Sequence, residues 1–212
     1  MKTCIIFCAG EFHGLAEPIE AEDYLIAADG GLTHLENLNR IPDCILGDFD
    51  SLGYVPPDGV VFPVEKDDTD SMLAVRQGLK MGFRRFILYG AMEGARLDHT
   101  VANFQTLQFI ADRGGVGYLV GRDTIATVIK NTTLNFPACD EGILSVFCMG
   151  ADAEGVTIRG AQYTLENGTL TAGMPLGVSN HFVGKKVDIS VKSGSLLVLS
   201  PLKNGISEVD LC

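Results

Sequence analysis

The sequence predicts an α/β domain with a mainly parallel sheet at residues 1–125, followed by an all-β, sandwich-like domain at residues 126–212. Short apolar runs alternate with helix-length segments in the first part, which is typical of βαβ units with buried parallel strands. Helical periodicity ends after about Gly121, and short β-branched runs then recur between turn residues. The boundary is therefore expected near residues 121–131, without a low-complexity linker.

The first domain is predicted to contain six strands and two clear helices. The strands are the apolar runs at residues 3–7, 24–28, 44–47, 60–64, 85–89 and 116–120. A helix is predicted at about 69–81, because acidic residues stand near its start, where the helix dipole is positive, and Gly82 can end it. A second helix is predicted at about 99–113, with an apolar stripe along one face and Asp98 as its N-cap.

The second domain is predicted to consist of short strands joined by turns. The strands are the runs at residues 132–136, 143–148, 156–159, 178–182, 186–191 and 195–199. The dipeptide Asn167-Gly168 is a strong hairpin signal, so a turn is predicted there between short strands at 163–165 and 169–170.

Composition restricts the class of function. Hydrophobic residues make up 46% and charged residues 20% of the 212 residues, which are ordinary proportions for a folded globular chain. The formal net charge of −11 disfavours binding to nucleic acid or to an anionic membrane. A polyphosphate substrate would be repelled as well, so a divalent cation is expected wherever such a substrate binds.

Cysteines and the first residues indicate the compartment. The six cysteines form no C-x-x-C pair, and several stand within apolar strand-like runs, so reduced core thiols are expected. The apolar run near the start is short and is soon followed by Glu11 and Glu17, so neither a signal peptide nor a membrane anchor is expected. The predicted location is the cytoplasm.

Two aspartates directly follow the third predicted strand, in the sequence CILGDFDS. If the backbone stays extended there, Asp48 and Asp50 point to the same side and can bind one hard cation. Gly47 leaves room for a close approach, and ligands of open α/β sheets bind at the carboxyl ends of strands. A solvated acidic loop is the alternative.

A second acidic cluster, KDDTD, stands at the start of the helix predicted at 69–81. A single acid in a first turn is an ordinary partner of the helix dipole. Three acids within four residues repel one another and favour a bound cation. Asp70 is therefore predicted to complete a magnesium site with Asp48 and Asp50, and Lys66 stands just before the cluster.

Polar side chains also stand near two other predicted strand-to-helix turns. Arg96 can donate two hydrogen bonds to phosphate oxygens, whereas Asp98 is equally well explained as a helix cap. In the sequence AADGG, Asp29 and Gly30 end a strand and precede a helix. The glycines there could turn backbone amides toward a phosphate, or they could simply allow a tight turn.

The order of these motifs resembles the thiamine pyrophosphokinase family. The motifs are DGG at 29–31, GDFDS at 47–51, KDDTD at 66–70, RLDHTVAN at 96–103 and GVSN at 177–180, and they cover nearly the whole chain. The resemblance implies an N-terminal α/β domain that holds ATP and magnesium and a C-terminal β-sandwich that supplies part of the thiamine pocket. It also implies a homodimer with sites between subunits.

The resemblance implies a role for each matching residue. The metal-binding residues are Asp48, Asp50 and Asp70, which are also expected to be catalytic together with Asp98. Asp29 is expected near the metal positions, and Arg96, Asp98 and Asn103 match the nucleotide-side motif. The full set of expected cofactor-binding residues is Asp29, Gly30, Lys66, Arg96 and Asn103. The expected thiamine-binding residues are Ser179 and Asn180. The chain departs from the family's pattern at His181, where an acidic residue is usual, and it has no Trp to stack on thiamine.

The segment GVSN has its own local interpretation. Gly177 permits an unusual backbone turn, while Ser179 and Asn180 offer donors and acceptors suited to the edge of an aminopyrimidine. The alternative is that both side chains only satisfy a hairpin.

The implied reaction is attack by the primary hydroxyl of thiamine on the β-phosphorus of ATP, which gives thiamine diphosphate and AMP. Positioning and charge neutralisation would supply most of the rate. Three alternatives are a metal-dependent phosphohydrolase, transfer from ATP to another alcohol such as a pterin, and a non-catalytic nucleotide or thiamine sensor. The full carboxylate set favours an enzyme over a sensor, and the segment with Ser179 and Asn180 favours thiamine over water as the acceptor.

Overall fold

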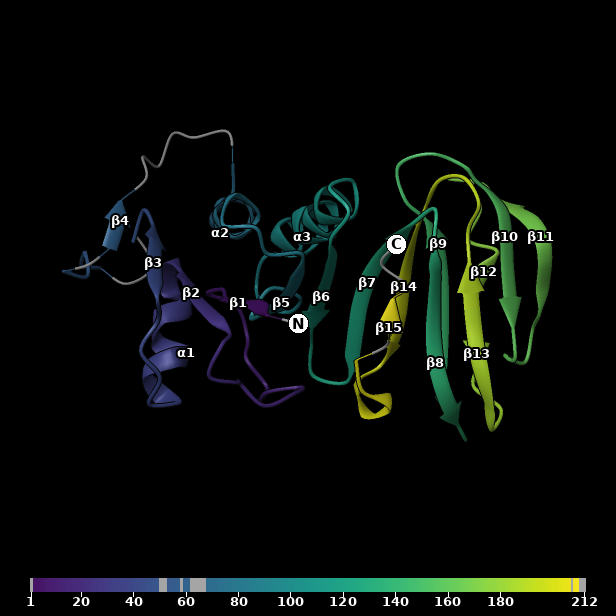
Figure 1. Ribbon diagram of the computed structural model, residues 1–212, viewed down its shortest axis with the longest axis horizontal. Helices are drawn as coiled ribbons and strands as arrows, with labels where there is room; N and C mark the ends of the chain where they lie inside the picture. The colour runs from purple at the N-terminus through teal and green to yellow at the C-terminus, as the bar shows by residue number, and fades with distance from the viewer. Residues whose placement is uncertain (1, 50–52, 58, 62–67, 207, 210–212) are drawn as a thin grey trace. The chain divides into compact units, whose positions relative to one another are not determined.

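The computed structural model describes residues 2–49, 53–57, 59–61, 68–206 and 208–209, and the chain divides into two compact units (Figure 1). One unit comprises Met1–Thr106 and Gly117–Arg122, and the other comprises Leu107–Val116 and Asp123–Cys212. The predicted fold class is confirmed, because the first unit has parallel strands with helices and the second is built almost entirely from antiparallel strands. No helix in the described part of the chain is long and apolar enough to cross a membrane.

The first unit is an open parallel sheet with helices. Its strands are β1 (Thr3–Phe7), β2 (Tyr24–Ala28), β3 (Cys44–Gly47), β4 (Gly59–Val61), β5 (Arg85–Tyr89) and β6 (Val116–Val120). Its helical segments are the 3-10 turn η1 (Asp29–Gly31), α1 (Leu32–Asn37), α2 (Asp70–Lys80) and α3 (Leu97–Ala111), the last of which is shared with the second unit from Leu107 on. The strand order is β6-β5-β1-β2-β3-β4, and β5, β1, β2, β3 and β4 pair in parallel.

The topology of this sheet creates a crevice. The connection through α1 leads from β2 to β3, away from β1, whereas the connection through α2 returns across the sheet from β4 to β5. Since such crossovers are right-handed, α1 and α2 cover opposite faces of the sheet, as Figure 1 shows. The direction of the crossovers therefore reverses between β1 and β5, and in open α/β sheets ligands bind at the carboxyl ends of the strands where this happens.

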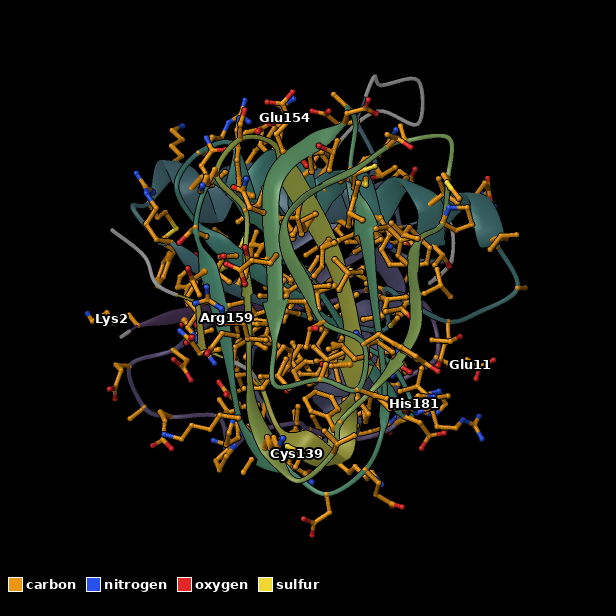
Figure 2. All side chains as sticks on the ribbon, turned by 90° about the vertical axis from the view of Figure 1, so that its right-hand side faces the viewer. Lys2, Glu11, Cys139, Glu154, Arg159 and His181 are labelled. Atoms are coloured by element: carbon orange, nitrogen blue, oxygen red, sulfur yellow. The ribbon has the colours of Figure 1, made fainter. Side chains whose placement is uncertain are left out.

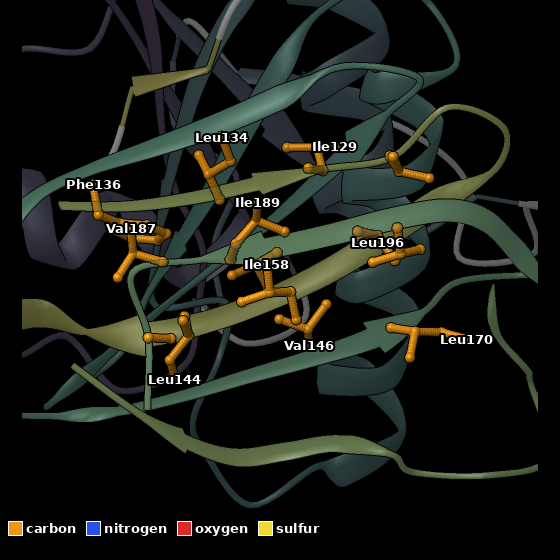
Figure 3. Close-up of a cluster of buried hydrophobic side chains, with 14 of the residues drawn as sticks. Ile129, Leu134, Phe136, Leu144, Val146, Ile158, Leu170, Val187, Ile189 and Leu196 are labelled. Carbon is orange, nitrogen blue, oxygen red and sulfur yellow. The ribbon is translucent and has the colours of Figure 1, made fainter. Parts of the chain in front are cut away.

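The second unit is a sandwich of antiparallel strands. Its strands are β7 (Thr124–Lys130), β8 (Thr133–Cys139), β9 (Ile143–Cys148), β10 (Ala153–Arg159), β11 (Leu165–Leu170), β12 (Gly177–His181), β13 (Lys185–Ser190), β14 (Ser195–Pro201) and β15 (Glu208–Val209), with a 3-10 turn, η2 (Leu202–Asn204). The strand orders are β12-β9-β14-β7 and β11-β10-β13-β8-β15. Side chains from both sets of strands form one buried apolar cluster (Figure 3). On the outer surface, exposed Arg159, labelled in Figure 2, forms an ion pair with Glu166.

The predicted hairpin at Asn167-Gly168 is wrong. Residues on both sides of this dipeptide belong to the single strand β11, which pairs with β10 through a register shift between Val156 and Ile158. Asn167 has a φ of 49°, and its N–H donates to Thr157 Oγ1 at 3.1 Å. The irregularity is a β-bulge, which uses the same left-handed backbone as a two-residue hairpin. The dipeptide thus indicated a local conformation and not a chain reversal.

Strand β7 was not predicted. Its residues stand where the sequence suggested a domain boundary, yet five of its seven residues are buried, from Ile125 to Ile129. Loss of helical periodicity there reflects a buried strand, in which apolar residues run continuously and do not alternate.

Candidate active site

A cavity of about 350 Å³ lies in the first unit, at the carboxyl ends of its parallel strands. It is lined by the segments that follow β1, β2 and β5 and by the first turns of α2 and α3. This is the crevice that the reversal of crossovers between β1 and β5 predicts.

One wall of the cavity consists of closely crossing backbone. The N–H of Gly10 donates to the carbonyl of Gly90 at 2.9 Å, and the N–H of Cys8 donates to the carbonyl of Tyr89 at 2.8 Å. A Cβ on Gly10 would lie 2.5 Å from the carbonyl oxygen of Glu93, and one on Gly90 would lie 2.4 Å from that of Cys8. Gly90 also has a φ of 63°, so glycine is required there for two reasons.

Three carboxylates from separate elements meet in the first unit. Asp29 follows β2, Asp48 follows β3 and Asp70 is the first residue of α2, and a carboxylate oxygen from each lies within 4.8 Å of the others. Asp29 is buried, and Asp48 and Asp70 are half-buried. Carboxylates this close repel one another unless a cation or protons lie between them.

Asp29 gives the clearest indication that the cluster can bind a cation. Its Oδ1 is buried and has no hydrogen-bond partner within the described residues; the other such side-chain oxygen is the uncharged Oε1 of Gln108. Its backbone is held in the left-handed region, with a φ of 49°, and a Cβ on Gly47 would lie only 3.0 Å from its Cα. An unpartnered buried carboxylate oxygen is costly, and a hard divalent cation would satisfy it. The three side chains therefore fit Mg²⁺.

The cluster differs from the predicted ligand set. Asp48 and Asp70 are in it, while Asp50 lies outside the described residues, as does Lys66. Asp29, expected near the metal positions but not named as a metal ligand, is the third member. The premise of an extended backbone after β3 is wrong, because Phe49 has a φ of 61°.

The DGG motif forms a tight strand-to-helix turn. Asp29, Gly30 and Gly31 make up the 3-10 turn η1, which leads directly into α1. A Cβ on Gly31 would lie 1.9 Å from the carbonyl oxygen of Phe7, so close packing against β1 requires this glycine. Gly30 is half-buried. The turn therefore fixes the position of Asp29 at the end of β2.

Asn103 is buried beside the cavity, and both ends of its amide have protein partners. Its Nδ2 donates to the carbonyl of Ala91 at 2.6 Å, and its Oδ1 accepts from Ser71 Oγ at 2.6 Å. Thr69 is the N-cap of α2, since its Oγ1 accepts from the N–H of Met72 at 3.3 Å. The described structure thus gives Asn103 a role within the protein's own hydrogen bonds.

Arg96 and Asp98 form an exposed ion pair. The guanidinium of Arg96 donates from Nε at 3.2 Å and from Nη2 at 2.5 Å to the Asp98 carboxylate, and both side chains are about two-thirds exposed. These hydrogen bonds hold the pKa of Asp98 below its usual value. Helix α3 begins at Leu97, so the prediction that Asp98 is its N-cap is wrong. Arg96 lines the cavity, and Asp98 does not.

The GVSN segment lies on β12 in the second unit. Asn180 is buried, its Nδ2 donates to the carbonyl of Tyr163 at 2.6 Å, and its Oδ1 accepts from the N–H of the same residue at 2.9 Å. Ser179 is exposed, has a φ of 60°, and donates its N–H to Ser145 Oγ at 3.1 Å. The left-handed residue is therefore Ser179 and not Gly177, where a Cβ would lie 2.3 Å from the carbonyl oxygen of Val146.

The cysteines of the described chain are free thiols, as the sequence suggests. Cys8 lines the cavity, and burial, with a smaller effect of the nearby Asp70, raises the pKa of its thiol to about 12. Cys8 therefore stays protonated at neutral pH and is not a nucleophile.

Comparisons with known proteins find one family. Two family models match: "Thiamin pyrophosphokinase, catalytic domain" at residues 15–114 and "Thiamin pyrophosphokinase, vitamin B1 binding domain" at residues 131–196. A thiamine pyrophosphokinase of Bacillus subtilis (strain 168) is 26% identical over 82% of this chain and 85% of its own length.

Several solved structures with similar folds carry the same family name. The crystal structure of thiamine pyrophosphokinase from Bacillus subtilis has a TM-score of 0.81 at 24% identity, covering 94% of this chain and 99% of that one. The enzyme structure from Geobacillus thermodenitrificans has a TM-score of 0.78 at 25% identity, with coverages of 95% and 97%. Yeast thiamin pyrophosphokinase has a TM-score of 0.69 at 14% identity, with coverages of 96% and 87%. The two-unit fold is thus the fold of these structures.

Proposed function

Because the chain belongs to the thiamin pyrophosphokinase family, we propose that it transfers a pyrophosphoryl group to thiamine, with ATP as the donor and Mg²⁺ as the cofactor. The acceptor atom is the primary hydroxyl of thiamine, and the products are thiamine diphosphate and AMP. The two matched regions cover the α/β part and the β-sandwich part of the chain separately, which supports an activity that needs both.

The observation that carries this proposal is the carboxylate cluster with its unpartnered buried oxygen on Asp29. Asp29, Asp48 and Asp70 would hold Mg²⁺, and Asp50 is retained as a further ligand. Bound Mg²⁺ would neutralise negative charge on the phosphate oxygens. This resolves the conflict between a chain of net charge −11 and a polyphosphate substrate.

The remaining steps fall to the chain's own side chains. Arg96 is exposed and lines the cavity, so its guanidinium can exchange Asp98 for a phosphate oxygen and take up charge as the pyrophosphoryl group moves. Lys66 is proposed to assist on the nucleotide side. An aspartate of the cluster is proposed to accept the proton of the thiamine hydroxyl, and its position next to the transferred group would make that transfer direct.

The test is incubation of the protein with ATP, Mg²⁺ and a panel of alcohols, followed by mass spectrometry. We expect AMP and thiamine diphosphate in equal amounts, and no diphosphate ester of a pterin alcohol. Release of inorganic phosphate or pyrophosphate without any ester would instead identify a phosphohydrolase. Binding of thiamine or nucleotide without turnover would identify a sensor.

Three further properties are proposed from the family resemblance. Ser179 and Asn180 contribute to the thiamine side, the enzyme works in the cytoplasm, and it is a homodimer with sites between subunits. Light scattering together with activity at nanomolar concentration tests the dimer. A monomer with full activity would contradict both the dimer and the shared site.

A further inference from the structure

Three polar side chains and two backbone groups form a continuous hydrogen-bonded chain beside the cavity. The N–H of Met72 donates to Thr69 Oγ1 at 3.3 Å, and Thr69 Oγ1 lies 3.0 Å from Ser71 Oγ. Ser71 Oγ donates to Asn103 Oδ1 at 2.6 Å, and Asn103 Nδ2 donates to the carbonyl of Ala91 at 2.6 Å. Ser71 and Asn103 are 7% and 5% exposed, so water does not compete for the central bond.

The direction of every bond in this chain is fixed by chemistry. The carbonyl of Ala91 can only accept, so the amide of Asn103 must turn its Nδ2 toward it and its Oδ1 toward Ser71. Ser71 has one hydroxyl proton, which goes to that Oδ1, and it must therefore accept from the hydroxyl of Thr69. Hydrogen bonds that all run in one direction polarise one another and strengthen the chain.

The position of this chain relative to the carboxylates suggests its purpose. Asp70 stands between Thr69 and Ser71, so the residues on both sides of it are held by the same set of bonds. At the other end, Ala91 belongs to the segment that leads from β5 to Arg96. The two residues of the central bond are 32 positions apart in sequence, so the bond joins two walls of one cavity.

We propose that Ser71 and Asn103 are a positioning pair, which holds the carboxylate of Asp70 in place for metal binding and ties it to the segment that carries Arg96. Asn103 acts through Ser71 and not by contact with the nucleotide. This positioning role rests on the metal site of the proposed function and does not depend on which alcohol accepts the pyrophosphoryl group.

The test measures Mn²⁺ binding to the full-length protein without nucleotide, from the electron paramagnetic resonance signal of free Mn²⁺. We expect Ser71→Ala and Asn103→Ala each to raise the Kd for Mn²⁺ about 5- to 10-fold, the size expected when a net hydrogen-bond energy of about one kcal/mol is lost. The Kd of the double variant for Mn²⁺ should be no higher than the higher of the two single-variant values, because each single substitution already removes the same interaction. Ser71→Thr keeps the hydroxyl and should restore affinity.

A matched control separates positioning from general destabilisation. Thr106 is fully buried on the same helix as Asn103, and its hydroxyl donates to the carbonyl of Ala102, outside the chain of bonds. Thr106→Val should lower the unfolding temperature but leave the Kd for Mn²⁺ within about twofold. Equal weakening by Thr106→Val would overturn the proposal.

The outcomes also separate this pair from the proposed function. A higher KM for ATP in Asn103→Ala, with unchanged Mn²⁺ affinity in both single variants, would make Asn103 a nucleotide contact and overturn the positioning role. Failure of the wild-type protein to bind Mn²⁺ would overturn the metal site and the pair with it. Transfer to an alcohol other than thiamine would leave the pair's role intact.

Discussion

Asp29 in the first unit and Asn180 in the second are both buried polar side chains, 7% and 4% exposed, but they differ in their partners. The amide of Asn180 bonds both the N–H and the carbonyl of Tyr163, while Oδ1 of Asp29 has no partner within the described chain. Since burying an unpaired charged oxygen is far more costly than burying a bonded amide, the two have different explanations. The hydrogen bonds of Asn180 stabilise the fold before any ligand binds, whereas the unpartnered carboxylate of Asp29 is explained by a ligand.

The largest effect that tests this contrast is expected from Asp29→Asn. Loss of one charge from the cluster should lower kcat/KM by about 10²- to 10³-fold, as removal of a charge-stabilising group does in other enzymes. In the presence of a chelator the variant should unfold at a higher temperature than the wild type, because repulsion among the three carboxylates is relieved. Steady-state kinetics and thermal melts measure the two effects.

The matched control for that variant is Asp112→Asn. Asp112 is a partly exposed carboxylate that already has a partner, Lys130. The Asp112→Asn variant should have unchanged activity, and its unfolding temperature should not rise. Normal activity of Asp29→Asn at saturating Mg²⁺ would contradict the assignment of the three carboxylates as the metal site.

For the second unit, Asn180→Ala should lower the free energy of unfolding by about 1 to 3 kcal/mol, because the N–H and carbonyl of Tyr163 would lose a buried partner. The KM for thiamine should also rise far more than the KM for ATP, because Asn180 is proposed to contribute to the thiamine side. Ser179→Gly is the control for stability alone, since glycine suits the φ of 60° and keeps the N–H bond to Ser145. A loss of stability with an unchanged ratio of the two KM values would show instead that Asn180 is a purely structural residue.

A smaller effect is expected from Asp98→Asn. The hydrogen bonds from Arg96 hold the pKa of Asp98 below its usual value, so this carboxylate is ionised throughout the neutral range and is a weak base. We expect kcat to change by less than about threefold and the acid limb of the pH–rate profile to stay in place, because general acid-base groups supply about 10²- to 10⁴-fold. A loss in that larger range would make Asp98 catalytic.

The smallest effect concerns the paired carboxylate Asp112. Its pKa is lowered, chiefly by the hydrogen bond from Lys130 Nζ at 2.7 Å. A carboxylate with a lowered folded-state pKa contributes stability above its unfolded pKa of about 3.9, and this is lost as the pH falls through the folded value. Lys130→Met should therefore reduce stability near pH 7 by at most about 1 kcal/mol, since the pair is about 40% exposed. The difference from wild type should vanish near pH 2, as urea titrations at both pH values would show.

Much of the fold could be predicted from the sequence because its signals are local. Apolar runs between turn residues predicted β1, β2, β3, β5 and β6 with the ends that the structure has. The bulge at Asn167 was missed because a left-handed Asn fits either a bulge or a reverse turn, and only the pairing of β11 with β10 decides between them.

The composition of the site could be predicted only in part, because it depends on which strands and helices are neighbours in space. Asp48 and Asp70 were expected to share a ligand because both stand in conspicuous acidic motifs. The family resemblance placed Asp29 near them, but its membership of the cluster depends on β2 lying beside β3 in the sheet, which sequence spacing does not specify. The bond between Ser71 and Asn103 was likewise out of reach, since it depends on how two helices begin at one cavity.

Strand β12 is the last in its strand order, and its irregular backbone has a consequence for solubility. Its pairing with β9 shifts register between Gly177 and Asn180, and Ser179 between them has a left-handed backbone. A flat, regular outer strand offers a row of unpaired amides and carbonyls to which another chain can add, as in amyloid growth. The kink at Ser179 breaks that row, so this border of the sandwich is a poor template for aggregation.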